Sequence, residues 1–192
     1  FVGTKKQAQG IVIEEAAISG SYYIAERWLG GTLTNFATVK KSIRKLLALE
    51  KKATDGTYDK ITKKEILDIE REKGKMKLVL DGIVPMRRLP GALVIADIQK
   101  DDIEVKEAKK LGIPVFAITD TNTDPETVDF AIPANDDASK SIQIIFKALN
   151  EGIIAGNAKV KVKKDDRADY PAEKMERGDK KPMRKPRVKS EE

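Results

Sequence analysis

The feature that most limits the fold of this chain is the alternation of short apolar runs with longer segments of helical periodicity. Five runs have the pattern of strands, at residues 1–2, 21–25, 92–97, 114–118 and 128–132. Helical segments follow several of them, and Gly20 and Gly112 stand where two of these helices should stop. Strands that alternate with helices pair in parallel and carry helices on both faces. The pattern therefore predicts a three-layer α/β fold with a parallel sheet.

The region between the second and third runs breaks this alternation. Its apolar residues repeat at heptad-like spacing in two stretches, residues 36–46 and 66–80. Thr62 and Glu65 form the T-x-x-E pattern of a capping box, which would start the second helix, and DGTYD at 55–59 supplies a turn. We therefore expect an inserted antiparallel helical hairpin with coiled-coil packing.

These patterns divide the chain into four parts. Residues 1–35 and 83–156 form the two parts of the α/β domain, 36–82 the hairpin and 157–192 a tail. The tail has no apolar period and holds 13 basic and 8 acidic residues, so we expect it to be disordered alone. Ordering on RNA and a plain solubilising role both remain open for it. Because the sequence starts with an apolar run instead of methionine, we expect the numbering to begin inside a longer, N-terminally truncated chain.

The absence of two residue types limits the catalytic and metal-binding chemistry that this chain can perform. The 192 residues include neither cysteine nor histidine. Disulfides and thiolate metal sites are therefore excluded, which fits a reducing cytoplasm or organelle matrix. The usual general base, the histidine-based nucleophile pairs and the histidine zinc sites are excluded too. No apolar run approaches the roughly 20 residues that span a bilayer, so we expect no membrane partner.

The charge is distributed unevenly. Residues 38–77 hold 13 basic and 7 acidic side chains, whereas residues 97–137 hold 4 basic and 11 acidic ones. Such a distribution suits a protein that binds a polyanion by one face. On the first hairpin helix, cations four positions apart repel each other by a few tenths of a kcal/mol per pair, roughly, and a phosphate backbone would relieve this. A merely solvated face is the alternative. The cations are Lys40, Lys41, Arg44 and Lys45.

The stretch ERWLGGTLTN at 26–35 contains the only tryptophan. One interpretation is a tight turn before a helix, with Trp28 as a core anchor. The other is a recognition loop, in which Arg27 and Trp28 offer a flat cation and a flat ring while two glycines let the backbone approach a partner closely. In that loop three further side chains could bond to sugar hydroxyls or bases, namely Thr32, Thr34 and Asn35.

Two hypotheses compete for the carboxyl ends of the strands, where open parallel sheets bind ligands. In the first, an enzyme uses GTKK at 3–6 as a phosphate-binding turn, with Asp97, Asp120 and Asp124 as metal ligands or acid-base groups. The chain has neither nucleotide-binding glycine motif, however, and tight loops favour Asp and Asn anyway. In the second, Lys5, Lys6 and Arg27 join the hairpin cations in binding structured RNA. The second hypothesis explains more of the charge distribution.

Five stretches occur in the order typical of one protein family. They are GTKKQAQ, YYIAERWLGGTLTNF, RRLPGALVIAD, KEAKKLGIPVFAITDTNTDP and VDFAIPANDDASKSI. With a helical hairpin between the second and third strands, the chain resembles the bacterial small-subunit ribosomal protein number two, the S-two family, from Phe1 to about Ile154. From this resemblance we expect the family's N-terminal segment to be missing before Phe1 and the tail to lie outside the common core.

The resemblance implies a flavodoxin-like parallel sheet of strand order 2-1-3-4-5 with a projecting coiled coil. It also implies a structural constituent of the small ribosomal subunit that binds ribosomal RNA and supports assembly and translation, without catalysis, cofactor or metal. Partners would be other small-subunit proteins, including the large mRNA-binding protein number one, on a cytoplasmic or organellar ribosome. The positions carried over as RNA-binding are Lys5, Lys6, Arg27, Trp28, Thr32, Thr34, Asn35, Lys40, Lys41, Arg44 and Lys45.

Overall fold

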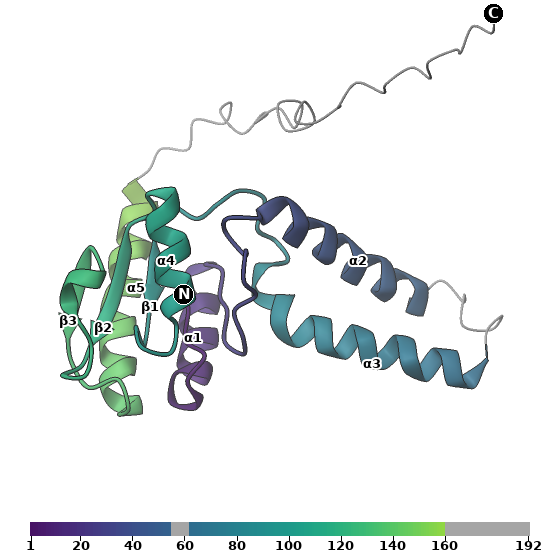
Figure 1. Ribbon diagram of the computed structural model, residues 1–192, viewed down its shortest axis with the longest axis horizontal. Helices are drawn as coiled ribbons and strands as arrows, with labels where there is room; N and C mark the ends of the chain where they lie inside the picture. Colours follow the sequence, from purple (N-terminus) through teal and green to yellow (C-terminus); the bar gives the residue numbers. More distant parts are fainter. Residues whose placement is uncertain (55–61, 160–192) are drawn as a thin grey trace, which may run out of the picture. The chain divides into compact units, whose positions relative to one another are not determined.

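The computed structural model describes residues 1–54 and 62–159 (Figure 1). Residues 1–157 form one compact unit. Its helices and strands are, in chain order, α1 (Lys6–Ser19), α2 (Phe36–Thr54), α3 (Lys63–Leu80), the short 3-10 helix η2 (Asp81–Ile83), β1 (Leu93–Ile95), α4 (Asp102–Leu111), β2 (Val115–Thr119), the 3-10 helix η3 (Pro125–Thr127), β3 (Phe130–Pro133) and α5 (Ser139–Lys159).

The sheet is parallel, as the sequence predicts. Its three strands lie in the order β1-β2-β3 and correspond to the third, fourth and fifth predicted runs. The first two predicted runs form only isolated single-residue bridges. Val2 pairs in parallel with Ile24 on one side and with Ile95 on the other. The α/β class is thus confirmed, and the five-strand order stays a prediction.

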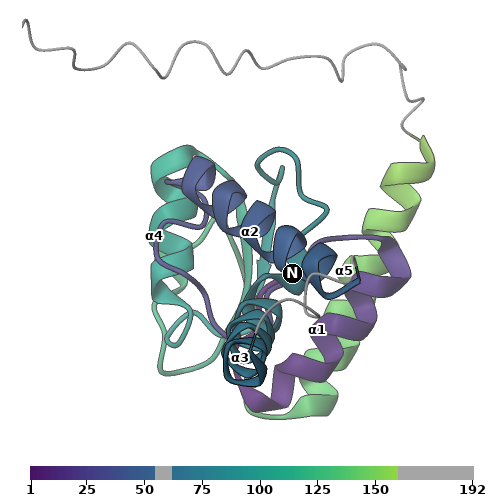
Figure 2. The ribbon, with the colours of Figure 1, turned by 90° about the vertical axis from the view of Figure 1, so that its right-hand side faces the viewer.

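Helices cover both faces of the sheet (Figure 2). Alternate residues of a strand point to opposite faces. Ile118 of β2 therefore packs with Val12 of α1 and Phe146 of α5, whereas Ala117 packs in the cluster that contains Val105 of α4. Two apolar clusters result, one on each side of the strands, and they fix the position of the strand ends at which charged residues gather.

Local sequence signals set the ends of the helices. Gly20 and Gly112 end α1 and α4 in the left-handed conformation, with φ of 66° and 67°, which glycine adopts at little cost. At the start of α3, the Thr62 backbone N–H donates to Glu65 at 3.1 Å and the Glu65 N–H donates to the Thr62 hydroxyl at 3.4 Å. The predicted stop signals and capping box are therefore confirmed.

α2 and α3 run side by side in opposite directions (Figure 1). Ile43 and Leu46 of α2 are buried in the same cluster as Leu80 of α3. The predicted turn at 55–59 lies outside the described residues, and coiled-coil packing stays a prediction. α5 runs to Lys159, past the predicted start of the tail at residue 157; residues 160–192 also lie outside the described part.

A close contact joins the hairpin to the sheet. The Tyr23 N–H donates to the Gly82 carbonyl at 3.2 Å. A Cβ at Gly82 would lie 2.2 Å from the Tyr23 carbonyl oxygen, so only glycine fits there. The end of α3 is thereby fixed against the segment that contains Ile24. Among the helices of the described ranges, none is long and apolar enough to cross a bilayer.

Candidate nucleic-acid interface

The loop at 26–35 is built around one carboxylate on α4. Glu107 accepts hydrogen bonds from the Trp28 indole N–H at 3.1 Å and from the backbone N–H groups of Gly31 at 2.6 Å, Leu33 at 2.9 Å and Thr34 at 3.0 Å, together with the Thr34 hydroxyl at 3.1 Å. Burial alone would raise the pKa of Glu107, but these hydrogen bonds to the charged form outweigh it and lower the pKa. The carboxylate is therefore held ionised at the centre of the loop.

This arrangement separates the predicted loop residues into two groups. Trp28 and Thr32 are only 7% and 1% exposed, and the Thr32 hydroxyl donates to the Leu29 carbonyl at 2.5 Å. Their side chains face the core, which favours the interpretation of Trp28 as a packing anchor and argues against stacking on a base. Arg27, Thr34 and Asn35 are exposed.

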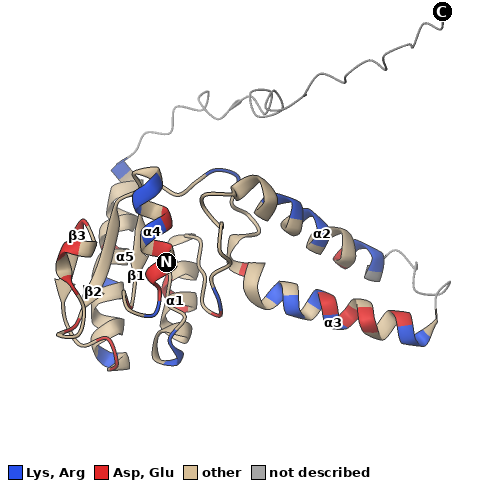
Figure 3. Ribbon diagram, in the orientation of Figure 1, with Lys and Arg blue, Asp and Glu red and all other residues tan. Residues whose placement is uncertain are grey.

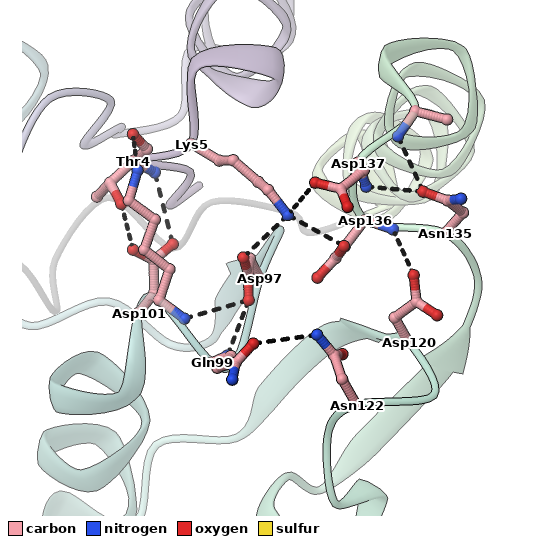
Figure 4. A network of polar contacts seen from close by, with 12 residues as sticks. Thr4, Lys5, Asp97, Gln99, Asp101, Asp120, Asn122, Asn135, Asp136 and Asp137 are labelled. Carbon is pink, nitrogen blue, oxygen red and sulfur yellow. Dashed lines mark hydrogen bonds and ion pairs between the residues drawn. The ribbon is translucent and has the colours of Figure 1, made fainter.

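Lys5 lies among three carboxylates at the carboxyl ends of the strands (Figure 4). Its ammonium is 3.3 Å from Asp97, 3.1 Å from Asp136 and 2.5 Å from Asp137. Burial would lower the pKa of Lys5, but the hydrogen bonds to these carboxylates outweigh burial and raise it. A lysine so neutralised contributes little attraction to a phosphate. The next residue, Lys6, is exposed.

The other polar groups at this edge also contact one another. The Thr4 hydroxyl donates to Asp101 at 2.6 Å, and the Gln99 N–H donates to Asp97 at 2.8 Å. Asp120 accepts from the Asp136 N–H at 3.4 Å (Figure 4). Within the described ranges, no group of three or more carboxylates is arranged to hold a metal ion. The enzyme hypothesis thus gains no geometric support, because the GTKK turn and the aspartates are used in the protein's own contacts.

Asp124, the remaining carboxylate of the enzyme hypothesis, accepts from the Glu126 N–H at 2.9 Å. It therefore caps η3, which is the structural role that the loop composition allows. Tight-loop chemistry accounts for this residue without a ligand.

The cations of α2, blue in Figure 3, are exposed to different degrees. Lys41 and Arg44 are exposed, and Lys40 lies over the Phe36 ring with its ammonium 4.7 Å from the ring centroid. Lys45 forms an ion pair with Glu72 of α3. The repulsion expected within this row is therefore reduced at Lys45, because the antiparallel neighbour supplies an acidic partner. Arg44 and Lys41 remain the most accessible charges of the row.

Comparison with known proteins identifies the family. The family model described as ribosomal protein S2 matches residues 1–156. The chain belongs to the ribosomal protein S2 family. A small ribosomal subunit protein uS2 from Chlorobium chlorochromatii (strain CaD3) is 56% identical over 154 residues, which are 80% of this chain and 61% of that protein. Another uS2, from Cytophaga hutchinsonii, is 53% identical over 166 residues, covering 86% of this chain and 65% of its own length.

The resemblance seen in the sequence is thus confirmed. The chain spans about three fifths of the length of the first curated relatives that it matches. Sequence reasoning missed the part that Glu107 plays, although the KEAKKLG stretch that supports the family resemblance contains it. One of three acidic residues on a helix of mixed charge gave no signal of its five donors, which lie more than 70 positions earlier.

Proposed function

We propose that this chain is a structural constituent of the small ribosomal subunit that binds small-subunit ribosomal RNA and performs no catalysis. The observation that carries the proposal is the family match over residues 1–156, with relatives named as small ribosomal subunit proteins. The exposed cations of α2 support it independently. They offer charge to a polyanion, whereas the aspartates at the carboxyl ends of the strands are used within the protein.

Binding would proceed by release of counterions from the RNA backbone. Each phosphate neutralised makes the logarithm of affinity fall by about 0.7 to 0.9 for each tenfold rise in salt. Of the predicted residues, we assign contact with RNA to those that are accessible, and a supporting role to Lys5, Trp28 and Thr32. The contact residues are Lys6, Arg27, Thr34, Asn35, Lys40, Lys41, Arg44 and Lys45.

For the whole native protein we propose the family's finer features. The sheet has the order 2-1-3-4-5, supported by the place of Val2 between Ile24 and Ile95. The hairpin at 36–82 is a coiled coil inserted between the two parts of the α/β domain, 1–35 and 83–156, and 157–192 is a separate tail. Neighbours are other small-subunit proteins, including the large mRNA-binding protein number one, on a cytoplasmic or organellar ribosome.

Sedimentation tests this function. The chain is added to bacterial small subunits stripped of their own S2 protein and is separated on a gradient after a moderate salt wash. We expect co-migration with the subunits. The double variant Lys40→Glu with Arg44→Glu should lose it, whereas Lys140→Glu with Lys147→Glu, the same charge change at exposed positions of α5, should retain it. Migration of the unaltered chain only at the top of the gradient would refute the proposal.

A further inference from the structure

The two edges of the sheet carry opposite charge. The carboxyl edge holds Asp97, Asp120, Asp136 and their neighbours around Lys5. At the opposite, amino edge, where β1 and β2 begin, lie four exposed cations, which we call the amino-edge cations: Arg87, Arg88, Lys109 and Lys110. None belongs to the contact residues assigned above.

The fold brings these four residues to one edge from two segments. α4 connects the end of β1 to the start of β2, so its last turn, with Lys109 and Lys110, lies at the amino edge. The segment that carries the two arginines leads directly into β1. The Leu93 N–H donates to the Pro114 carbonyl at 2.9 Å, which joins the start of β1 to the chain just after α4.

Contacts with the apolar core hold the arginine segment in place. Met86 is 5% exposed and belongs to the same core cluster as Ile113, which follows α4. The Met86 N–H donates to the Ile83 carbonyl at 3.0 Å. Pro85 and Pro90 flank the pair and fix their own φ angles. A segment so constrained loses little conformational entropy when its arginines bind a partner.

No residue in the described part of the chain pairs with the amino-edge cations. Within the described ranges, none of them forms an ion pair or a side-chain hydrogen bond. An acidic residue at this edge, Asp129, accepts from the Val115 N–H at 2.8 Å and forms no ion pair with these cations. Four exposed cations without acidic partners repel one another, and a polyanion would relieve that repulsion.

This edge is continuous with the basic face of the hairpin. Glu107 lies one turn before Lys110 on α4 and bonds to Thr34, two residues before α2 begins. The start of α2 is thereby tied to the last turns of α4. Figure 3 shows basic residues on the segment that leads to β1, on the end of α4 and along α2.

We propose that Arg87, Arg88, Lys109 and Lys110 form a phosphate-binding surface, continuous with Lys40, Lys41 and Arg44 of α2, that binds the sugar-phosphate backbone of a folded RNA. The proposal rests on the proposed function and names the second contact surface for it. The paired arginines suit this partner because each guanidinium can bind a phosphate through two parallel hydrogen bonds. The aspartates of the carboxyl edge then take no part in binding the RNA.

The test uses the full chain and small-subunit ribosomal RNA transcribed in vitro and refolded with Mg²⁺. Affinity is measured over a range of salt concentrations for the unaltered chain, for Arg87→Gln with Arg88→Gln, and for Lys140→Gln with Lys147→Gln on α5. We expect the arginine variant to bind about tenfold more weakly and its salt slope to fall by about 1.4 to 1.8. The α5 variant should match the unaltered chain, and equal urea midpoints should show that all three are folded.

The outcomes separate the two claims. If the unaltered chain binds with a steep salt slope and the arginine variant keeps both slope and affinity, the amino-edge surface is wrong while the proposed function stands. If that variant binds RNA normally but fails to enter small subunits, the surface binds a protein neighbour, which also overturns the assignment to RNA. If the unaltered chain itself shows no salt-dependent binding, the proposed function fails.

Discussion

Replacing Glu107 by glutamine should release the loop at 26–35 from α4. The carboxylate accepts five hydrogen bonds, from Trp28, Gly31, Leu33 and twice from Thr34. Glutamine has one oxygen, and its NH₂ group would point at N–H donors that have no other partner in the loop. At least two of the five bonds are therefore lost, and the acceptor that remains is uncharged.

Although Glu107→Gln only replaces a carboxylate oxygen by an NH₂ group, we expect it to cause a large loss of stability. A hydrogen bond to a charged group contributes about 1.5 to 3 kcal/mol, and each buried donor left unpaired costs about 1 to 3 kcal/mol. Some of the N–H groups that lose their acceptor can bond to water instead. We therefore expect Glu107→Gln to lower the free energy of unfolding by about 3 to 5 kcal/mol. This is a substantial share of the roughly 5 to 15 kcal/mol that stabilises a typical domain.

Urea unfolding, followed by the fluorescence of the single tryptophan, measures this effect where it occurs. Glu126→Gln, at an exposed carboxylate, serves as the control and should change stability by less than about 0.5 kcal/mol. The pKa of Glu107 is lowered in the folded protein, so its contribution is present above its ordinary value of 4.5 and is lost as the pH falls through the folded value. A Glu107→Gln protein within 1 kcal/mol of the unaltered chain at pH 7, roughly, would refute this account of the loop.

Three further changes test the fold. Gly82→Ala places a methyl group 2.2 Å from the Tyr23 carbonyl oxygen and should lower the free energy of unfolding, measured by thermal unfolding, by about 2 to 4 kcal/mol. The control Gly74→Ala meets no atom within contact distance and should raise that free energy by about 0.5 to 1 kcal/mol. Burial raises the pKa of Glu104 to about 7, so the folded state loses stability as the pH rises from 4.5 to 7. Glu104→Gln should abolish that loss. At pH 8 the variant should be more stable than the unaltered chain by about 1 to 2 kcal/mol, after allowance for solvent screening. Lys5→Met leaves three carboxylates unpaired and should lower stability by about 3 to 5 kcal/mol in urea at pH 7, an effect absent if the cluster is merely solvated.

Features coded by neighbouring residues could be predicted from the sequence. The stops at Gly20 and Gly112 and the capping box at Thr62 depend on a few adjacent positions, and the structure confirms them. The parallel strands from Leu93 onward followed from apolar runs that alternate with helical segments. The earlier runs were predicted as strands but form only isolated bridges, in which Val2 pairs with Ile24 and with Ile95.

The role of each candidate site residue depended on distant partners, which the sequence does not pair. Lys5 looks like a phosphate ligand beside Thr4, and only the fold brings Asp97 and Asp136 to its ammonium. Trp28 is ambiguous until Glu107 is seen to accept from its indole. Charge patterning placed a basic face on the hairpin, but the continuation to the amino edge required knowing which way α4 runs.

The central claim is that the basic face of α2 meets RNA while the acidic segment between β2 and β3 does not. Because the chain contains no cysteine, single cysteines can be introduced to carry a tethered iron chelate that cleaves nearby RNA. One is placed at Ala48→Cys on α2 and the other at Glu126→Cys in η3, both at exposed positions. In reconstituted small subunits we expect strand cleavage of ribosomal RNA from the first and none from the second. Cleavage from Glu126→Cys alone would contradict the account.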